Sequence, residues 1–577
     1  MVQRKVKNPL DLRSSLLAAF FIVCFFIIVL RLGYLQIVRG KESKARAEAQ
    51  RNMVLKLLPT RGEINLIENS TDQLLPVATN IQKPLVYAVP GEIQNPVLAA
   101  ASLSSVLSLE HNELLNKLAN KQKKYVVLKK QLSDEEVNKI KEIKLSGIYF
   151  DHEGFRYYPQ GSLLSQVLGF VGYKGDTKQG VYGLESFFES ELAGKEGVLK
   201  QEGDISGAWI FGGNRQLDAA KDGDSLILTI DKNIQYEAQK VLKETVEKNE
   251  ATSGTVIIAD PKTGKILAMA GFPDFDPNKY SEVTDPAAFN NEATIGSYEP
   301  GSVFKPLTMA AALNEGKITP DTTFVDEGFV KIDDKTIKNS DPKPRGLQTM
   351  TQVLEESLNT GLIFVKDQIG NQKFLEYVKK FGFGEKTGID LMERKGNLDN
   401  LKANINVNFA TASFGQGLTV TPIQLIQAFT AFPNSGKMLK PYIVASRISP
   451  EGQRTDTKVK EVRQIISAQT ANTVTAMMVN VVENGHGKRA GVPGYYIAGK
   501  TGTAQVPKIN GLGYEENVNI GTFIGFGPVE DPKFLMLVRI DKPKTVKFAE
   551  STAAPAFGQL AQYLVNYFQI PPTRETR

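Results

Sequence analysis

The sequence predicts an α+β fold behind a single N-terminal membrane helix. Apolar, β-rich runs occur near the middle of the chain and again close to its end: residues 254–260, 265–270, 495–505, 522–527 and 534–540. The segment between the two groups, residues 304–431, is mostly helical in pattern, with loops. Strands on both sides of a helical block predict one domain whose sheet is assembled from distant segments.

The N-terminal segment has the composition of a membrane anchor. Residues 1–13 are basic, with Asp11 as their one acid, and residues 14–38 carry no charge apart from Arg31. A bilayer core needs about 20 apolar residues, and a basic flank stays in the cytoplasm. No small-x-small cleavage site follows, which favours an uncleaved anchor over a removed signal peptide or a buried soluble helix. We expect a cytoplasmic tail at 1–13, a transmembrane anchor at 14–38 and an extracytoplasmic remainder.

The composition limits which partners and ligands the rest of the chain is expected to have. The 577 residues suffice for about three or four domains, and 23% charged with 41% hydrophobic residues indicates a mostly globular protein. The net charge of +6 is small, and the three histidines (His111, His152 and His486) are scattered. We therefore expect no nucleic-acid partner, no metal site and no cofactor. Cys24 is the single cysteine, so the chain forms no internal disulfide.

The region after the anchor has mixed character. A polar helical stalk is expected at residues 42–53, and residues 52–213 have the pattern of short strands and helices. Charged and apolar residues alternate at helical spacing over residues 110–144, which predicts solvated helices. Two turn-rich stretches, 155–159 and 180–185, carry no chemistry that their residues alone reveal.

A shift in composition at residues 221–224 marks a domain boundary. A strand is predicted at 225–230 and a helix at 234–248. Residues 261–264, Pro-Lys-Thr-Gly, join the first two β-rich runs as a hairpin. A final amphipathic stretch covers residues 554–568.

The stretch around Ser302 combines a serine nucleophile with a candidate base. Pro300-Gly301 breaks the chain before a helix-like run at 307–313, which places Ser302 at a helix N-terminus. Lys305 follows three residues later and shares a face with Ser302. A serine hydroxyl attacks after a neighbouring base takes its proton, and a lysine can be that base if burial or other cations lower its pKa. The helix N-terminus adds positive charge where an oxyanion would form.

An S-x-x-K pair is weak evidence by itself, because Ser340 and Lys343 have the same spacing in a proline-broken loop. Ser357 and Asn359, two residues apart at a helix end or loop, could supply a hydroxyl for proton relay and an amide for a peptide carbonyl. This pair is also uninformative when taken alone.

Lys500-Thr501-Gly502-Thr503 lies in a predicted late strand. Gly502 would allow a substrate backbone to approach the strand edge, as when an extended peptide is bound by strand addition. Lys500 with the hydroxyls of Thr501 and Thr503 would suit a carboxylate.

Other interpretations compete with this one. K-T-G also occurs at residues 262–264 and 386–388, in a hairpin turn and after a Gly-rich loop. Residues 494–501 match the phosphate-loop pattern G-x-x-x-x-G-K-[ST], and residues 534–541 resemble an apolar strand ending in an acid. A phosphate loop must open a helix, whereas this segment continues extended to Pro507. Nucleotide binding at 494–501 is thus the remote alternative.

Taken in order, these patterns form the set S-x-x-K, S-x-N and K-T-G. With them, the chain resembles the monofunctional (class B) penicillin-binding proteins, and best the division-specific transpeptidases among them, from the anchor to about residue 565. The shorter pieces that share the resemblance are Arg31-Leu32, Leu35-Gln36, Arg61-Gly62-Glu63-Ile64, Arg156-Tyr157-Tyr158-Pro159, Gly183-Leu184-Glu185, Tyr298-Glu299-Pro300-Gly301, Gly415-Gln416-Gly417 and Ala498-Gly499.

The resemblance implies a transpeptidase domain of the serine β-lactamase-like fold at residues 222–568, an antiparallel sheet with helices on both sides. An elongated, mixed α/β pedestal domain of the dimerisation type is implied at residues 50–215. The implied activity is that of a bacterial membrane D,D-transpeptidase, which cross-links peptidoglycan stem peptides, in septal synthesis, and is acylated by β-lactams. The implied partners are a D-Ala-D-Ala donor, an amine acceptor, a membrane glycan polymerase and other division proteins.

The resemblance also implies roles for the catalytic residues. Ser302 attacks the penultimate D-alanine carbonyl to form an acyl-enzyme, with Lys305 as general base. Ser357 and Lys500 relay the proton to the leaving group. An amine of a neighbouring stem peptide then resolves the acyl-enzyme.

The implied substrate-binding residues come from the other two patterns. Asn359 holds the peptide amide, and Thr501, Gly502 and Thr503 form the strand that receives the substrate, with both threonine hydroxyls on its terminal carboxylate. The backbone N–H groups of Ser302 and Thr503 form the oxyanion hole.

Alternatives to this function remain. They are an elongation-type transpeptidase, a penicillin-recognising sensor or scaffold, a β-lactamase, a D,D-carboxypeptidase and a Ser-His-Asp hydrolase, although no G-x-S-x-G is present. The sequence departs from the family at residues 65–69 and at Gly485-His486-Gly487, where Gly-Thr-Gly is usual. We interpret His486 as incidental.

Overall fold

The computed structural model describes residues 9–41, 52–68, 73–175, 177–202, 215–508 and 513–575. The chain forms two compact units. The first contains residues 1–60 and 194–222, and the second contains residues 61–193 and 223–577.

In the first unit, helix α1 (Pro9–Gly33) continues into a π-helical turn, η1 (Tyr34–Val38). Residues Arg13–Val38 are long and apolar enough to cross a membrane, and none of the most apolar window is buried in the protein. This agrees with the predicted anchor. The predicted stalk at 42–53 lies almost wholly outside the described residues.

The described part of the first unit also contains a three-stranded antiparallel sheet in the order β1-β8-β9. Its strands are β1 (Asn52–Leu57), β8 (Gly197–Glu202) and β9 (Arg215–Asp218).

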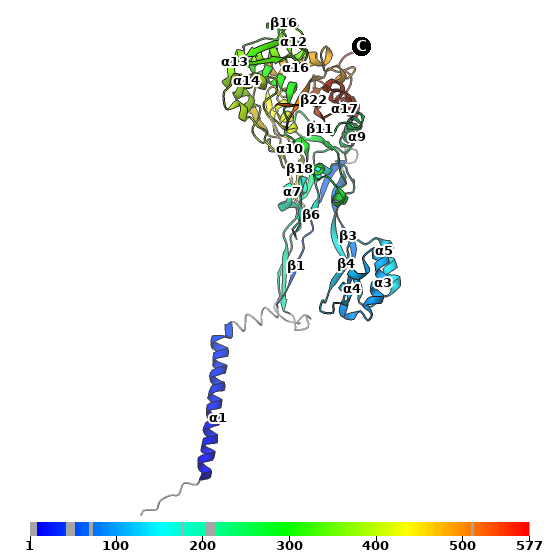
Figure 1. Ribbon diagram of the computed structural model, residues 1–577, viewed down its shortest axis with the longest axis vertical. Coiled ribbons are helices and arrows are strands. Elements are labelled where there is room, and N and C mark those ends of the chain that lie inside the picture. Colours follow the sequence, from blue (N-terminus) through cyan, green and yellow to red (C-terminus); the bar gives the residue numbers. More distant parts are fainter. Residues whose placement is uncertain are drawn as a thin grey trace, which may run out of the picture. The chain divides into compact units, whose positions relative to one another are not determined.

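In the second unit, the long strand β3 (Gln73–Ala88) pairs with β4 (Val126–Lys129) and β5 (Ile148–Tyr157). Helices lie beside these strands and share an apolar core with them (Figure 1). They are α3 (Pro96–Leu107), α4 (His111–Ala119) and α5 (Asp134–Ile143).

The prediction of helices throughout residues 110–144 was wrong at β4. Val126 and Leu128 are buried there, whereas Val127 and Lys129 are only half-buried, which is the period-two pattern of a strand. The smaller elements of this part are η2 (Pro90–Glu92), α6 (Ser165–Leu168), β6 (Val171–Lys174), β7 (Thr177–Gly180), α7 (Gly183–Phe187) and α8 (Glu189–Leu192).

A seven-stranded sheet joins early and late segments of the second unit. Strand β10 (Ser225–Leu228) runs parallel to β2 (Ile64–Glu68) and antiparallel to β18 (Val444–Ile448), which pairs in turn with β19 (Arg454–Asp456). The strand predicted at 225–230 therefore exists, but it belongs to this sheet and not to the central one.

The central sheet has five antiparallel strands in the order β12-β11-β23-β22-β21, so β21 lies at its edge. The strands are β11 (Ser253–Ala259), β12 (Ile266–Phe272), β21 (Ala498–Pro507), β22 (Tyr514–Gly527) and β23 (Phe534–Asp541). The prediction of one sheet built from distant segments is confirmed.

Both faces of this sheet are covered because its strands are apolar on both sides. Val256 and Ile258 belong to the core beneath α9 (Lys232–Lys248) and α17 (Ala553–Tyr567), while Ile257 and Ala259 face the helical block. Alternate residues of a strand point to opposite faces. Figure 1 shows α9 and α17 beside β11 and β22.

The helical block confirms the predicted helical middle of the domain, apart from two small ribbons of paired strands. Its helices are α10 (Glu292–Ile295), α11 (Lys305–Asn314), α12 (Met350–Glu355), α13 (Asn359–Lys380), α14 (Asn406–Ala412), α15 (Pro422–Phe429) and α16 (Ala468–Glu483). The paired strands are β13 (Thr323–Asp326) with β16 (Gly346–Thr349), and β14 (Phe329–Ile332) with β15 (Lys335–Lys338).

Short elements complete the unit. They are the ribbon of β17 (Lys437–Leu439) with β20 (Glu461–Gln464), and the 3-10 turns η3 (Pro277–Glu282), η4 (Pro286–Phe289), η5 (Gly301–Phe304), η6 (Asp399–Leu401), η7 (Lys488–Ala490) and η8 (Ala549–Ser551).

Candidate active site

Ser302 lies in the 3-10 turn η5, which leads directly into α11. The N–H of Lys305 donates to the carbonyl oxygen of Ser302 and closes this turn. Side chains three residues apart eclipse one another in a 3-10 turn, so Lys305 stands on the same side as Ser302. The helix begins two residues earlier than the sequence predicted, at Lys305 rather than at Leu307.

Lys305 is completely buried, and its ammonium group reaches the turn between α12 and α13. Its Nζ lies 2.5 Å from the carbonyl oxygen of Ser357 and 3.1 Å from the Ser357 Oγ. Ser357 adopts the left-handed backbone region, with φ of 56°. A non-glycine residue held there costs about 1–3 kcal/mol, and such strain clusters at functional sites.

Lys500 approaches the same hydroxyl from β21. Its Nζ lies 3.1 Å from Ser357 Oγ, 3.1 Å from the carbonyl oxygen of Thr501 and 3.3 Å from Thr501 Oγ1. Lys500 is also fully buried. The Ser357 hydroxyl therefore bridges two lysines that come from opposite walls, one from α11 and the other from the edge strand.

Burial sets the charge of this pair. It lowers the pKa of Lys305 well below its usual value, and the nearby Lys500 cation lowers that pKa further. Burial also lowers the pKa of Lys500, to about 7, while the Glu550 carboxylate acts in the opposite direction. Lys305 therefore loses its proton more readily, which is the condition that a lysine must meet to act as a base near neutral pH.

Gly502 lets the Ser302 turn pack directly on β21. A Cβ added at Gly502 would lie 2.9 Å from Val303 Cγ1, 3.0 Å from the carbonyl oxygen of Pro300 and 3.0 Å from the backbone nitrogen of Val303. The sequence indicated close approach at this glycine, and the group that approaches in the structure is the nucleophile turn. Because β21 is an edge strand, its outward N–H groups and carbonyls have no neighbouring strand to pair with.

The threonines of this strand have different partners. Thr501 is buried next to Lys500, whereas Thr503 is half-buried and its Oγ1 accepts a hydrogen bond of 3.1 Å from the N–H of Ala549 in η8. The hydroxyl proton of Thr503 is not used by this bond and can point to a ligand.

Asn359 is the first residue of α13, and a buried network fixes it. Its side-chain nitrogen donates to the carbonyl oxygen of Lys338 at 2.9 Å, and its backbone N–H donates to Asn339 Oδ1 at 2.8 Å. Asn339 donates in turn to the carboxylate of Asp326 at 2.9 Å, which also accepts from the Thr360 hydroxyl at 2.6 Å. Sequence reasoning missed Asp326 and Asn339, because nothing in the chain signals that a loop asparagine caps a distant helix.

Glu299 is another residue near the nucleophile whose role the sequence did not reveal. Its carboxylate accepts from the N–H of Gly417 at 2.9 Å and from the hydroxyl of Tyr514 on β22 at 3.0 Å. Burial raises the pKa of Glu299. These bonds attach the segment before Ser302 to the loop after α14 and to the sheet.

The competing copies of the motifs lie elsewhere. Ser340 is exposed in the loop between β15 and β16, and Lys262-Thr263-Gly264 forms the turn between β11 and β12. The phosphate-loop reading of residues 494–501 was wrong, because β21 continues as a strand from Ala498 to Pro507 and opens no helix. Within the described residues, no group of three or more His, Cys, Asp or Glu side chains could hold a metal ion.

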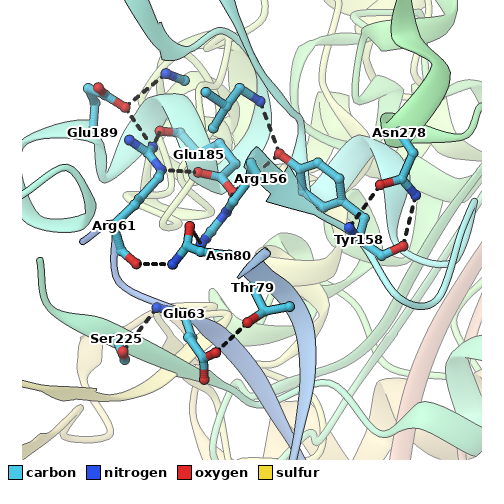
Figure 2. Close-up of polar contacts among 12 residues, drawn as sticks. Arg61, Glu63, Thr79, Asn80, Arg156, Tyr158, Glu185, Glu189, Ser225 and Asn278 are labelled. Carbon is cyan, nitrogen blue, oxygen red and sulfur yellow. Dashed lines mark hydrogen bonds and ion pairs between the residues drawn. The ribbon is translucent and has the colours of Figure 1, made fainter. Parts of the chain in front are cut away.

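The two turn-rich stretches of the pedestal region are joined by a buried ionic network (Figure 2). Glu185 is completely buried and pairs with Arg61 at 2.7 Å and with Arg156 at 2.6 Å. Burial alone would raise the pKa of Glu185, but the two guanidinium groups hold it below its usual value. Tyr158 and Asn278 exchange two hydrogen bonds through the backbone of Tyr158, which ties this network to η3.

Comparisons with known protein families agree with this arrangement. Residues 254–562 match the family model described as the penicillin binding protein transpeptidase domain, and residues 56–228 match the penicillin-binding protein dimerisation domain. The chain belongs to the penicillin-binding protein family. The fold expected from the resemblance, a penicillin-binding transpeptidase domain with a mixed α/β domain before it, is confirmed.

Curated relatives within the penicillin-binding family cover nearly the whole chain. Stage V sporulation protein D of Bacillus subtilis is 36% identical over 563 residues, which cover 96% of this chain and 85% of the relative. The probable peptidoglycan D,D-transpeptidase PbpC of Pseudomonas aeruginosa is 32% identical, over 97% of this chain and 96% of the relative.

Solved structures give the same fold. A peptidoglycan synthetase from Bifidobacterium adolescentis superposes with a TM-score of 0.72 at 25% identity, covering 91% of this chain and 98% of that one. Penicillin binding protein 3 from Mycobacterium tuberculosis, in complex with ampicillin, superposes with a TM-score of 0.69 at 25% identity, covering 90% of this chain and 98% of that one.

Proposed function

We propose that this chain cross-links peptidoglycan stem peptides through an acyl-enzyme on Ser302. The chain is a D,D-transpeptidase of the penicillin-binding family. The observation that supports the proposed nucleophile is the pair of hydrogen bonds from Lys305 and Lys500 to one hydroxyl, that of Ser357, beside the turn that carries Ser302.

In the acylation step, neutral Lys305 takes the proton of the Ser302 hydroxyl as its Oγ attacks the penultimate D-alanine carbonyl. The backbone N–H groups of Ser302 and Thr503 would stabilise the negative charge that develops on the carbonyl oxygen. The proton then passes through Ser357, assisted by the Lys500 cation, to the nitrogen of the departing D-alanine.

The donor peptide would bind along β21, as an added strand on the sheet edge. Its terminal carboxylate would contact the hydroxyls of Thr501 and Thr503, close to the Lys500 charge. Gly502 keeps this stretch close to the nucleophile, and the Asn359 side chain receives the peptide amide from the opposite wall. The same geometry would receive a β-lactam.

The anchor α1 would hold the enzyme in the cytoplasmic membrane with residues 1–13 inside and the catalytic domain outside, because the basic residues precede the apolar span. We further propose residues 50–215 as the pedestal and residues 222–568 as the transpeptidase domain. A membrane glycan polymerase and other division proteins are the proposed partners, since the reaction consumes newly made glycan strands.

Septal synthesis is the proposed cellular role, and a second role is favoured by one relative. The 36% identity to Stage V sporulation protein D supports spore-wall synthesis as the other candidate. The location of a fluorescent fusion of the full chain in its source organism distinguishes the two roles. Septal synthesis requires the fusion at every division site of growing cells, whereas its absence from those sites would contradict that role.

The test of the chemistry uses the full chain in detergent and a fluorescent penicillin. Ser302→Ala should abolish covalent labelling, while Ser340→Ala, which changes the exposed copy of the motif, should label like the unaltered protein. With lipid-linked peptidoglycan as the substrate, analysis of the products should then show cross-linked dimers. Persistent labelling of Ser302→Ala would place the nucleophile elsewhere, and release of D-alanine without dimers would indicate a carboxypeptidase.

A further inference from the structure

His486 and Glu550 form a pair near the motif residues. His486 Nδ1 lies 2.9 Å from Glu550 Oε2, and their side chains are 46% and 41% exposed. His486 lies in the loop after α16, and Glu550 lies in η8 before α17. Exposed ion pairs add little to stability, so a structural role explains the pair poorly.

The loop of His486 packs against the segment that ends at Ser357. A Cβ added at Gly485 would lie 2.5 Å from the carbonyl oxygen of Glu355 and 3.1 Å from its Cγ. Gly485, the residue before His486, therefore packs on the last turn of α12, two residues before Ser357. Burial and the neighbouring Glu356 carboxylate raise the pKa of Glu355, and the charge of Lys488 in η7 acts in the opposite direction.

Glu550 is positioned from the other wall, by β21. The residue before it, Ala549, donates its N–H to Thr503 Oγ1 at 3.1 Å. The Glu550 carboxylate is also close enough to Lys500 to oppose the lowering of its pKa by burial. The pair therefore spans from the Ser357 wall to the Thr503 end of the edge strand, where the proposed leaving group lies.

We propose that Glu550 and His486 form the subsite for the cationic amine of the acceptor peptide. This inference rests on the proposed function, because it supplies the second half of the same reaction. In transpeptidation the incoming amine takes the place that the departing amine has left. An acceptor amine is protonated near neutral pH, so it needs an anion to bind it and a base to make it nucleophilic.

The pair supplies both groups. Glu550 attracts the ammonium and holds the Nδ1 proton of His486, which leaves the Nε2 lone pair as the acceptor of a proton. The ammonium gives one proton to Nε2, and the amine attacks the Ser302 ester carbonyl. The C–N bond forms as the C–Oγ bond breaks, and the second nitrogen proton returns to the Ser302 oxygen. His486 then releases its proton to water.

The geometry also orders the two halves of the reaction. The donor carboxylate on Thr503 would lie near the Glu550 carboxylate, and like charges repel. Departure of the terminal D-alanine removes this repulsion and leaves Glu550 to receive a cation. The subsite therefore favours the acceptor only after the acyl-enzyme has formed.

The experiment measures acylation and aminolysis separately, with the full chain in detergent. The donor is a soluble peptide ending in D-alanyl-D-lactate, and the nucleophile is either a stem tripeptide with a free side-chain amine or hydroxylamine, which is largely uncharged at neutral pH. For Glu550→Gln and His486→Gln the measure is the ratio of aminolysis to acylation in the same variant, because Glu550 also opposes the lowering of the Lys500 pKa and so acts on acylation. This ratio should fall about 10- to 100-fold for the tripeptide and change little for hydroxylamine.

Glu550→Asp should recover part of the tripeptide reaction, and Glu461→Gln, which breaks the distant exposed pair with Lys437 (3.0 Å), should change neither nucleophile's rate. Unchanged tripeptide aminolysis in Glu550→Gln and His486→Gln would overturn the proposal. An equal loss for both nucleophiles would also overturn it, because a structural defect does not distinguish charge. Failure of the proposed function appears differently, as absent acylation of the unaltered protein.

Discussion

Lys305 and Lys500 are both completely buried, and the Ser357 hydroxyl lies 3.1 Å from the Nζ of each. Two cations cannot share such a site without loss, so the equilibrium favours one neutral amine and one ammonium. Burial and the Lys500 charge both lower the pKa of Lys305, which favours the neutral form of that amine. These directions favour Lys305 as the base and Lys500 as the proton donor.

The first prediction concerns the pH dependence of acylation. Acylation should rise with pH as Lys305 loses its proton and fall again as Lys500, with a pKa of about 7, loses its own. The second-order rate constant for a penicillin, measured from about pH 5 to 9, reports these groups in the free enzyme. In Lys500→Arg the alkaline fall should disappear, since a guanidinium stays charged. An alkaline limb that persists in this variant would assign that limb to another group.

The second prediction separates catalysis from stability at Lys305. The folded pKa of Lys305 lies below its unfolded value, so burial of this amine opposes folding at every pH below the unfolded pKa. Lys305→Met should slow acylation by about 10²–10⁴-fold. Its thermal midpoint should be equal to or higher than that of the unaltered protein. A large drop in the midpoint would show that the bonds of Lys305 to Ser357 outweigh the cost of burying its amine.

At the scale of elements, the start of α13 depends on a side chain from a different loop. Asn339 Oδ1 accepts from the backbone N–H groups of Asn359 and Thr360, at 2.8 and 3.1 Å. The first N–H groups of a helix have no partner within it, so a side chain that accepts from them acts as a cap. The same cap holds the turn that presents Ser357.

The third prediction follows from this cap. Asn339→Ala should lower the free energy of unfolding by about 0.5–2 kcal/mol, the usual effect of losing a cap. It should also slow acylation although Asn339 contacts neither lysine, because Ser357 loses its support. Asn339→Asp keeps the acceptor oxygens but places a second carboxylate near Asp326. Its stability and acylation rate should lie between those of the unaltered protein and those of Asn339→Ala. Normal acylation of a destabilised Asn339→Ala would show that the turn keeps its own geometry.

At the scale of the molecule, the Glu185 network joins segments that are far apart in the chain. Arg61 precedes β2, Arg156 lies in β5 and Glu185 belongs to α7, and Tyr158 connects them to Asn278 (Figure 2). Breaking a buried ion pair on one side leaves an uncompensated charge in the interior. A single substitution in this network should therefore lower the stability of the whole second unit.

The fourth prediction is that Glu185→Gln lowers the stability by about 3–5 kcal/mol, since the buried Arg156 guanidinium loses its partner carboxylate and Arg61 keeps only that of Glu189. The folded pKa of Glu185 lies below its unfolded value, so its contribution is complete above the unfolded value and is lost as pH falls through the folded one. Denaturation of the full chain in detergent at pH 7 and pH 4 measures both effects. Glu113→Gln, in the exposed pair with Lys117, is the control. Equal stability of Glu185→Gln and Glu113→Gln would contradict this account.

The distant strands of the central sheet could be predicted from sequence because their runs are apolar on both faces, as at Val256 to Ile258. The short strand β4 could not, since a few residues of alternating pattern are hidden among helical segments. The meeting of Lys305 and Lys500 at Ser357 could be anticipated because three short patterns, S-x-x-K, S-x-N and K-T-G, occur in this order in one chain. Asn339 and Glu550 have ordinary identities, and only their position in space gives them significance.

The N-terminal apolar helix, the α+β class and the short motifs were predictable from the chain alone, because each depends on local composition or on spacing within a few residues. Only folding fixes which lysines share the Ser357 hydroxyl, what caps α13 and which acid acts on the charge of Lys500. These properties depend on burial and on distances between residues such as Ser357 and Lys500, which lie far apart in the chain. Folding brings them together, and the chain order of the residues does not encode those distances.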